Sequence, residues 1–150
     1  MKGPVLVSAC LLGMRCRYDG ASRRCEAVAE EAIRRGWIPV CPEALGGLPT
    51  PRPASECRGD RVVNALGEDV TEAFRLGAEM ARTLAELYGA EAALLKERSP
   101  SCGRGLIYDG SFTHTLIPGD GITARALAEA GIAVYGESQL EELLAALEEE

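Results

Sequence analysis

The sequence has little histidine, few aromatic residues and no two cysteines in C-x-x-C spacing. Its 150 residues include one histidine, one tryptophan, two phenylalanines and four tyrosines. A structural zinc site needs four protein ligands at short, regular spacings, so scattered cysteines and the single His114 do not fit a zinc finger. Apolar runs stay well below the ~20 residues of a membrane-spanning helix, and we expect no membrane partner.

Six cysteines are nevertheless present. The segment Met1–Pro4 lacks the apolar stretch of a secretory signal and leads directly into a strand-like run. We therefore expect a cytoplasmic protein, in which disulfides are rare and cysteines more often serve metal binding or catalysis. Three cysteines with one open coordination position suit an iron–sulfur cluster or a catalytic metal better than a structural zinc ion.

The charge distribution bears on the partner. A net charge of −7 argues against a nucleic-acid polymer. Residues 1–62 carry ten Lys/Arg and seven Asp/Glu, a balance of +3, whereas the remainder carries six and sixteen, a balance of −10. Arginines of the first part could attract a small anion, although most of them fit solvated surface positions equally well. These arginines are Arg15, Arg17, Arg23, Arg24, Arg52, Arg58 and Arg61.

Alternating strand-like and helix-like segments predict one α/β domain over residues 1–150. Helical spacing of apolar residues predicts helices between short apolar runs. This alternation is typical of a mainly parallel, Rossmann-like sheet flanked by helices. The runs that we interpret as its strands are 5–9, 37–40, 92–95 and 132–135.

Three further segments interrupt this alternation. An Asp109-Gly110 turn between strand-prone flanks predicts a small hairpin insertion over 106–113. Residues 61–64 are a candidate edge strand. Residues 41–53 are rich in proline and glycine and predict a long ordered loop rather than a helix or strand.

Three cysteines stand where predicted strands end. Cys10 follows the first strand, Cys41 the second, and Cys102 lies in the loop 96–103 after the third. Open α/β folds build their sites at the carboxyl ends of parallel strands, so we predict that these thiols meet. Position alone leaves an equal alternative, in which they are small buried apolar residues. Cys16 and Cys25 fit bystander positions better than ligand positions, and the sequence gives no role for Cys57.

Polar side chains accompany these cysteines. Glu43 lies two residues after Cys41 and could act as a general base toward water, although a helix start or surface position explains its spacing better. Ser8, Ser99 and Ser101 could donate hydrogen bonds to a cluster or substrate, or satisfy loop backbone groups. His114 is expected on the surface.

Several segments together resemble the small bacterial family typified by thiouracil desulfidase, many members of which are labelled as a domain of unknown function. The resemblance covers nearly the whole chain, and linked motifs in one order are more specific than any single motif. The matching segments are Ser8–Gly13, Cys16–Gly20, Cys41–Glu43, Leu45–Arg52, Lys96–Gly103, Tyr108–Gly110 and Pro118–Gly121.

The resemblance implies a [4Fe–4S] cluster held by Cys10, Cys41 and Cys102. It also implies catalytic roles for Glu43 and Ser99, with Ser101 as the nearby alternative, and Ser8 remains a candidate cluster contact. The implied reaction is non-redox desulfuration of a thiolated nucleobase or its nucleoside or nucleotide. The thiocarbonyl sulfur binds the open iron, water attacks the carbon, and sulfide is released.

Two other functions remain open at this point. The chain could be a non-catalytic sensor or sulfur carrier that uses the same cluster. It could also be a metal-free module that binds a small anion through its arginines and the turn at Gly119–Gly121. The natural substrate, the strand order and the oligomeric state do not follow from the sequence.

Overall fold

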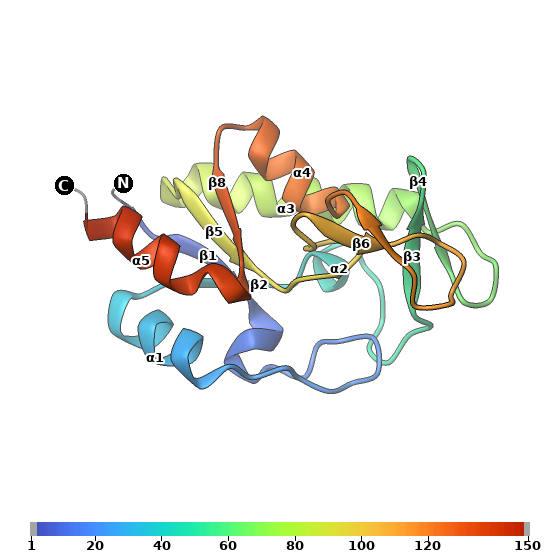
Figure 1. Cartoon of the computed structure of the whole chain (residues 1–150), viewed down its shortest axis with the longest axis horizontal. Coiled ribbons are helices and arrows are strands. Elements are labelled where there is room, and N and C mark those ends of the chain that lie inside the picture. The colour runs from blue at the N-terminus through green and yellow to red at the C-terminus, as the bar shows by residue number, and fades with distance from the viewer. Residues whose placement is uncertain (1–2, 149–150) are drawn as a thin grey trace.

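The computed structural model describes residues 3–148 and contains a four-stranded parallel sheet with helices on both faces (Figure 1). The strand order is β2-β1-β5-β8, and all neighbouring pairs are parallel. This confirms the predicted α/β fold with a mainly parallel sheet. The strands are β1 (Val5–Ser8), β2 (Ile38–Val40), β5 (Ala92–Leu95) and β8 (Ala133–Gly136).

Two helices cover each face of the sheet (Figure 1). On one face α3 (Thr71–Tyr88) and α4 (Ile122–Glu129) pack together, and on the other lie α1 (Glu26–Arg35) and α5 (Leu140–Glu148). A short 3₁₀ turn, η2 (Glu137–Gln139), links β8 to α5. Both faces are covered, which explains why the central strands read as continuous apolar runs.

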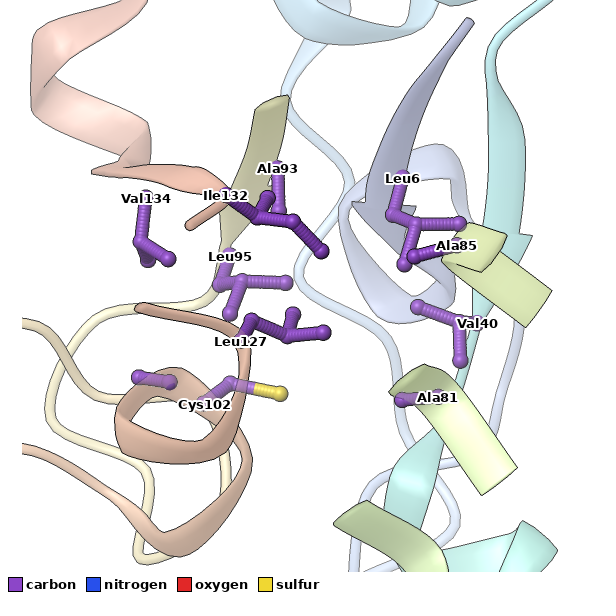
Figure 2. Close-up of a cluster of buried hydrophobic side chains, with 11 residues drawn as sticks. Leu6, Val40, Ala81, Ala85, Ala93, Leu95, Cys102, Leu127, Ile132 and Val134 are labelled. Atoms are coloured by element: carbon purple, nitrogen blue, oxygen red, sulfur yellow. The ribbon is translucent and has the colours of Figure 1, made fainter. Parts of the chain in front are cut away.

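Side chains alternate between these two cores along each strand, as the pleat requires. Leu6 of β1 packs toward α3 and α4, with Leu95 of β5 and Leu127 (Figure 2). Val5 and Val7 point to the opposite core. Within residues 3–148, no helix is both long and apolar enough to cross a lipid bilayer.

Two antiparallel hairpins lie beyond the carboxyl ends of the parallel strands (Figure 1). In the first, β3 (Ser55–Arg58) pairs with β4 (Arg61–Asn64), so the predicted strand 61–64 is confirmed and gains a partner that the sequence analysis missed. In the second, β6 (Leu106–Tyr108) pairs with β7 (Leu116–Pro118).

The predicted hairpin is present, but its turn and second arm were placed wrongly. Residues 109–115 form a loop, and the second strand begins at Leu116 rather than near Ser111. Asp109 Oδ1 accepts the Ser111 N–H at 2.9 Å, and the Glu56 carboxylate accepts the N–H groups of Gly110 and Phe112. These amides are therefore unavailable to a strand ladder.

The prediction of a loop without helix over residues 41–53 was wrong in one respect, because this segment contains the one-turn helix α2 (Pro42–Leu45). Pro42 occupies the first helical position, where its missing N–H costs nothing and its φ is already helical. A second short helix, the 3₁₀ turn η1 (Ala9–Leu12), replaces the expected end of the first strand.

Glycine lets α2 lie directly against α3. A Cβ on Gly77 would lie 1.9 Å from the carbonyl oxygen of Pro42. A Cβ on Gly46 would lie 2.0 Å from the carbonyl oxygen of Ala73. Neither position has room for any other residue. Because Cys41 and Glu43 bracket Pro42, this close approach sets the depth of both side chains relative to the sheet.

Candidate active site

A cavity of about 480 Å³ lies at the carboxyl edge of the sheet. Cys10 reaches it from η1 after β1, Cys41 from the residue after β2, and Cys102 from the loop after β5. The structure therefore brings together the three cysteines that the sequence places at strand ends. With Ser8 and Glu43 they form one side of the cavity, which we call the sheet-edge wall.

Ser8 joins the elements that carry this wall. It is 2% exposed. Its Oγ accepts the N–H of Lys96, the first amide after β5, at 2.8 Å. Its hydroxyl also bonds the Cys102 sulfur, which lowers the pKa of that thiol. One side chain thus fixes the end of β1, the start of the β5 loop and a candidate ligand relative to one another.

Burial dominates the acidity of two thiols. It raises the pKa of Cys10 to about 11, against the opposing charge of Lys96. It raises the pKa of Cys102 to about 12, against the hydrogen bond from Ser8. Negative charge on Cys41 adds to both increases in pKa. A bound metal would have to displace these protons, so metal uptake should improve as the pH rises.

Cys41 is the acidic thiol of the set. A hydrogen bond with the Cys16 thiol lowers the pKa of Cys41, burial opposes this, and the Ala44 N–H at the start of α2 lowers it further. The same thiol pair raises the pKa of Cys16. The sequence favoured a bystander position for Cys16, but this residue lines the cavity beside Cys41. Cys25, by contrast, precedes α1 and packs against the core.

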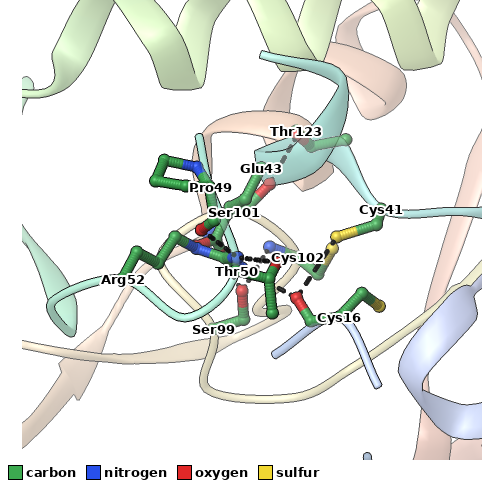
Figure 3. A network of polar contacts seen from close by, with 10 residues as sticks. All are labelled: Cys16, Cys41, Glu43, Pro49, Thr50, Arg52, Ser99, Ser101, Cys102 and Thr123. Atoms are coloured by element: carbon green, nitrogen blue, oxygen red, sulfur yellow. Dashed lines mark hydrogen bonds and ion pairs between the residues drawn. The ribbon is translucent and has the colours of Figure 1, made fainter. Parts of the chain in front are cut away.

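Glu43 and Arg52 form an ion pair in the cavity (Figure 3). Arg52 Nε donates to Glu43 Oε1 at 3.0 Å. The Glu43 side chain is 16% exposed and the Arg52 side chain is 4% exposed. Burial raises the pKa of Glu43, and Arg52 opposes the rise. A carboxyl group whose pKa is shifted toward neutrality is better matched to proton transfer at physiological pH.

The two candidate serines of the β5 loop occupy different surroundings. Ser99 lines the cavity, and its Oγ accepts the N–H groups of Ser101 and Cys102 at 3.1 and 3.0 Å. Its own hydroxyl hydrogen remains available to a ligand. Ser101 is buried, 2.8 Å from Thr123 Oγ1 of α4, and does not line the cavity (Figure 3). It fastens the loop to α4.

The opposite side of the cavity comes from the hairpins. Glu56 of β3, Tyr108 of β6 and His114 of the β6–β7 loop line it, and we call these three residues the hairpin wall. Glu56 Oε1 accepts the N–H groups of Gly110 and Phe112 at 3.0 and 3.1 Å. His114 is exposed as expected, but its ring also packs edge-on against Tyr108 at 5.8 Å.

Four cationic side chains besides Arg52 reach the cavity: Arg17, Arg23, Lys96 and Arg98. Lys96 Nζ pairs with Glu137 at 3.0 Å, and Arg17 lies 3.5 Å from Asp19. The side chains of Arg23 and Arg98 have no ion pair or hydrogen bond among the residues that the structure describes. The cavity therefore keeps cationic charge for an anionic group. Arg15, Arg24, Arg58 and Arg61 do not line it.

The thiols of the cavity are donors of the kind that hold an iron–sulfur cluster. Across residues 3–148, no three His, Cys, Asp or Glu side chains are gathered around one metal-ion position. A [4Fe–4S] cluster is held by thiolates that bind separate iron atoms, so its ligands stand further apart than those of one ion. Thiols from three strand ends around one cavity supply the donor type that such a cluster needs.

The fold and the cavity define a class of small α/β proteins that place thiols and a buried carboxylate at the carboxyl edge of a parallel sheet. Residues 5–139 match the family described as 2-thiouracil desulfurase, and the chain belongs to that family. This confirms the resemblance noted in the sequence.

Two relatives support the assignment. The "Uncharacterized protein YbbK" of Bacillus subtilis (strain 168) is 40% identical over 150 residues, which cover 93% of this chain and 99% of the relative. A solved structure described as a [4Fe–4S]-dependent thiouracil desulfidase, TudS, is 46% identical, with a TM-score of 0.92. That match covers 97% of this chain and 98% of the solved one.

Proposed function

We propose that this protein is a thiouracil desulfidase that holds a [4Fe–4S] cluster through Cys10, Cys41 and Cys102. The observation that carries the proposal is the sheet-edge wall, where three thiols from three strand ends share one cavity with the buried carboxylate of Glu43. When bound, the cluster supplies a Lewis-acidic iron with affinity for sulfur.

The reaction exchanges sulfur for oxygen without electron transfer. Water adds to the thiocarbonyl carbon, the C–S bond breaks, and the products are the oxo-base and hydrogen sulfide. Glu43 takes one proton from the attacking water and passes it to the sulfur, and the remaining hydroxyl proton leaves with the sulfur as the C=O bond forms. Ser99, whose hydroxyl hydrogen is free of loop contacts, donates a hydrogen bond to the substrate. Ser101 supports the loop from outside the cavity.

The substrate is a thiolated pyrimidine base, alone or as its nucleoside or nucleotide. The edge of a pyrimidine carries N–H and carbonyl groups that Ser99 and the hairpin wall can pair. Tyr108 and His114 offer flat apolar surface for its ring. Arg23 and Arg98, both without ionic partners in the described part of the chain, supply charge for a phosphate.

The test is conversion of thiobases by anaerobically reconstituted protein. Iron and acid-labile sulfide are quantified first, and then 2-thiouracil, thiouridine and thiouridine monophosphate are each supplied. We expect uracil-type product and sulfide in equal amounts, and none from the cluster-free protein. A cluster-loaded protein that is inert toward all three substrates would overturn the proposal.

Glu43→Gln separates an enzyme from a sensor or sulfur carrier. Glutamine keeps the shape of the side chain and removes the base, so kcat should fall by about 10²–10⁴-fold with the cluster retained. A sensor or carrier needs no base at this position. Unchanged turnover in Glu43→Gln would remove the general-base role.

A further inference from the structure

We propose that Arg52 is a positioning residue of the active site, which aims the Glu43 carboxylate into the cavity and fixes the loop 14–20 beside it. This inference rests on the proposed desulfuration, because Arg52 acts through Glu43. Arg52 differs from the other paired arginines in its burial. Its side chain is 4% exposed, compared with 45% for Arg24 and 46% for Arg61.

The guanidinium group is itself held in one orientation. Its Nη1 donates to the carbonyl oxygen of Pro49 at 3.1 Å and to Thr50 Oγ1 at 3.0 Å (Figure 3). Both partners belong to the loop that carries Arg52. Since the group is planar, these two bonds also set the direction of Nε, which faces Glu43 at 3.0 Å.

The pairing leaves one carboxylate oxygen of Glu43 for chemistry. Arg52 Nε occupies Oε1, whereas Oε2 has no hydrogen-bond partner among residues 3–148. No buried side-chain oxygen in that part of the chain lacks a partner, so Oε2 must be accessible. Glu43 lines the cavity. Arg52 therefore directs the free oxygen toward the space that a water molecule would occupy.

The same arginine ties a second segment to the site. Nη2 donates to the carbonyl oxygen of Cys16 at 2.9 Å, and the Arg52 N–H donates to the carbonyl oxygen of Tyr18 at 2.7 Å. The Cys16 carbonyl also faces Cys41 Sγ at 3.8 Å (Figure 3).

Lysine cannot reproduce this arrangement. A single ammonium group can pair with Glu43, but it lacks the planar fork that reaches Pro49, Thr50 and Cys16 at the same time. The geometry thus calls for arginine rather than for positive charge alone. A positioning role predicts a loss in turnover that a lysine only partly restores.

The experiment compares Arg52→Met, Arg52→Lys and the matched control Arg61→Met in the cluster-loaded protein. Arg61 pairs with Asp69 outside the cavity. For Arg52→Met we expect kcat to fall by about 10²-fold, because misplacing a catalytic group by about 1 Å has that effect. KM and iron content should stay within about twofold of wild type. Arg52→Lys should recover part of kcat, and Arg61→Met should change neither constant.

A double-mutant cycle with Glu43→Gln supplies the decisive readout. If Arg52 acts through Glu43, Arg52→Met costs little once Glu43→Gln is in place, so the two effects are not additive. Amide hydrogen exchange of the cluster-free protein gives a readout independent of activity. Arg52→Met should speed exchange in residues 14–20 and 46–53 and leave the parallel sheet unchanged.

Three results would overturn the positioning role: additive effects in the cycle, wild-type kcat in Arg52→Met, or loss of iron in both Arg52 variants. If Arg52→Met fails to fold, Arg52→Lys is used in the same cycle and tests the same coupling to Glu43. A wild-type protein that is inactive toward thiobases removes the proposed function instead, and hydrogen exchange then still decides whether Arg52 fixes the two loops.

Discussion

The two sides of the cavity are built in different ways. The sheet-edge wall stands at the ends of parallel strands buried on both faces, and Cys102 is itself part of the apolar core (Figure 2). The hairpin wall depends on a loop held by side-chain contacts, in which Glu56 accepts two N–H groups and Arg58 Nη2 donates to the Gly110 carbonyl oxygen. Rigid supports carry the groups whose spacing decides chemistry, whereas loops carry groups that select a ligand.

Backbone conformation shows the same contrast. In the β6–β7 loop Phe112 and His114 both have φ near +59°, a region that residues with side chains seldom adopt. Such conformations persist where the surroundings enforce them. Here Glu56 accepts the N–H groups of Gly110 and Phe112, and Arg58 Nη2 donates to the Gly110 carbonyl oxygen. We therefore expect changes in the sheet-edge wall to affect the cluster and kcat, and changes in the hairpin wall to affect KM.

The largest effect is expected when a thiol of the sheet-edge wall is removed, in comparison with removal of a thiol outside the cavity. Cys102→Ser removes a candidate cluster ligand, so anaerobic reconstitution should yield little bound iron and activity below detection. Cys57→Ser keeps a donor toward the Pro100 carbonyl oxygen, which Cys57 Sγ meets at 3.4 Å. It should retain iron and turnover near wild type. Iron content and thiouracil turnover of the two variants are measured side by side.

Equal iron content in Cys102→Ser and Cys57→Ser would contradict the assignment of the wall. Folding is checked for both variants by thermal unfolding of the cluster-free proteins. Comparable melting temperatures would show that a difference in iron arises from the lost ligand and not from a damaged core.

The next largest effect is expected from the packing of α2 against α3, which supports the sheet-edge wall. A Cβ at Gly77 would lie 1.9 Å from the Pro42 carbonyl oxygen. Gly77→Ala should therefore destabilise the protein by about 2–3 kcal/mol, as overpacking does, although alanine is normally the better helix former. The shift of α2 should also lower kcat. Glu79→Ala, on the exposed side of α3, is the control, and chemical denaturation with turnover assays measures both effects.

Retention of full stability in Gly77→Ala would mean that α2 and α3 can separate without cost. In that case the contact between Gly77 and Pro42 would not set the depth of Cys41 and Glu43, and the sheet-edge wall would be less rigid than the parallel sheet that carries it.

The sheet-edge wall was largely predictable from the sequence. Apolar runs identify buried strands, and parallel strands place the residues that follow them at one edge. That reasoning brought Cys10, Cys41 and Cys102 together. It could not show that Ser99 faces the cavity while Ser101 faces α4, because a loop has no periodicity that assigns directions to its side chains.

The hairpin wall was not predictable in the same way. Glu56 lies 54 residues from Gly110, whose N–H it accepts, and no local pattern indicates such a contact. The Asp109-Gly110 turn signal was overruled by it. Arg52 was likewise not distinguished from six other arginines that could attract an anion or lie on the surface, because burial of a cation depends on partners supplied by three separate segments. The one available signal was the length of the proline-rich segment 41–53, which indicated an ordered loop.

Alkaline pH should weaken the strand that supports the hairpin wall. Burial raises the pKa of Cys57, on β3 next to Glu56, to about 11 from a usual value of 9.0. The folded state then holds a proton that the unfolded state has released, so stability is intact below pH 9.0 and falls as the pH rises toward 11. The loss attributable to Cys57 is about 2 kcal/mol by pH 11.

Cys57→Ser isolates this contribution, because serine does not titrate in this range. Cluster-free wild type and variant are unfolded with denaturant between pH 8 and 11, and the difference between their unfolding free energies is followed. A difference that stays constant over this range would show that the thiol is hydrated and that β3 is less tightly packed than its burial indicates.

The smallest effect is expected from Glu56→Gln, which tests whether the hairpin wall selects the ligand. Glutamine keeps an oxygen that accepts the N–H groups of Gly110 and Phe112, but without the charge that strengthens both bonds. We expect a loss of about 1 kcal/mol in stability and a rise in KM of a fewfold, with kcat and iron content unchanged. Glu68→Gln, which alters an acceptor for Asn64 in the β4 turn, is the matched control. A fall in kcat without a change in KM would place Glu56 with the catalytic groups, and the division between the two walls would then fail.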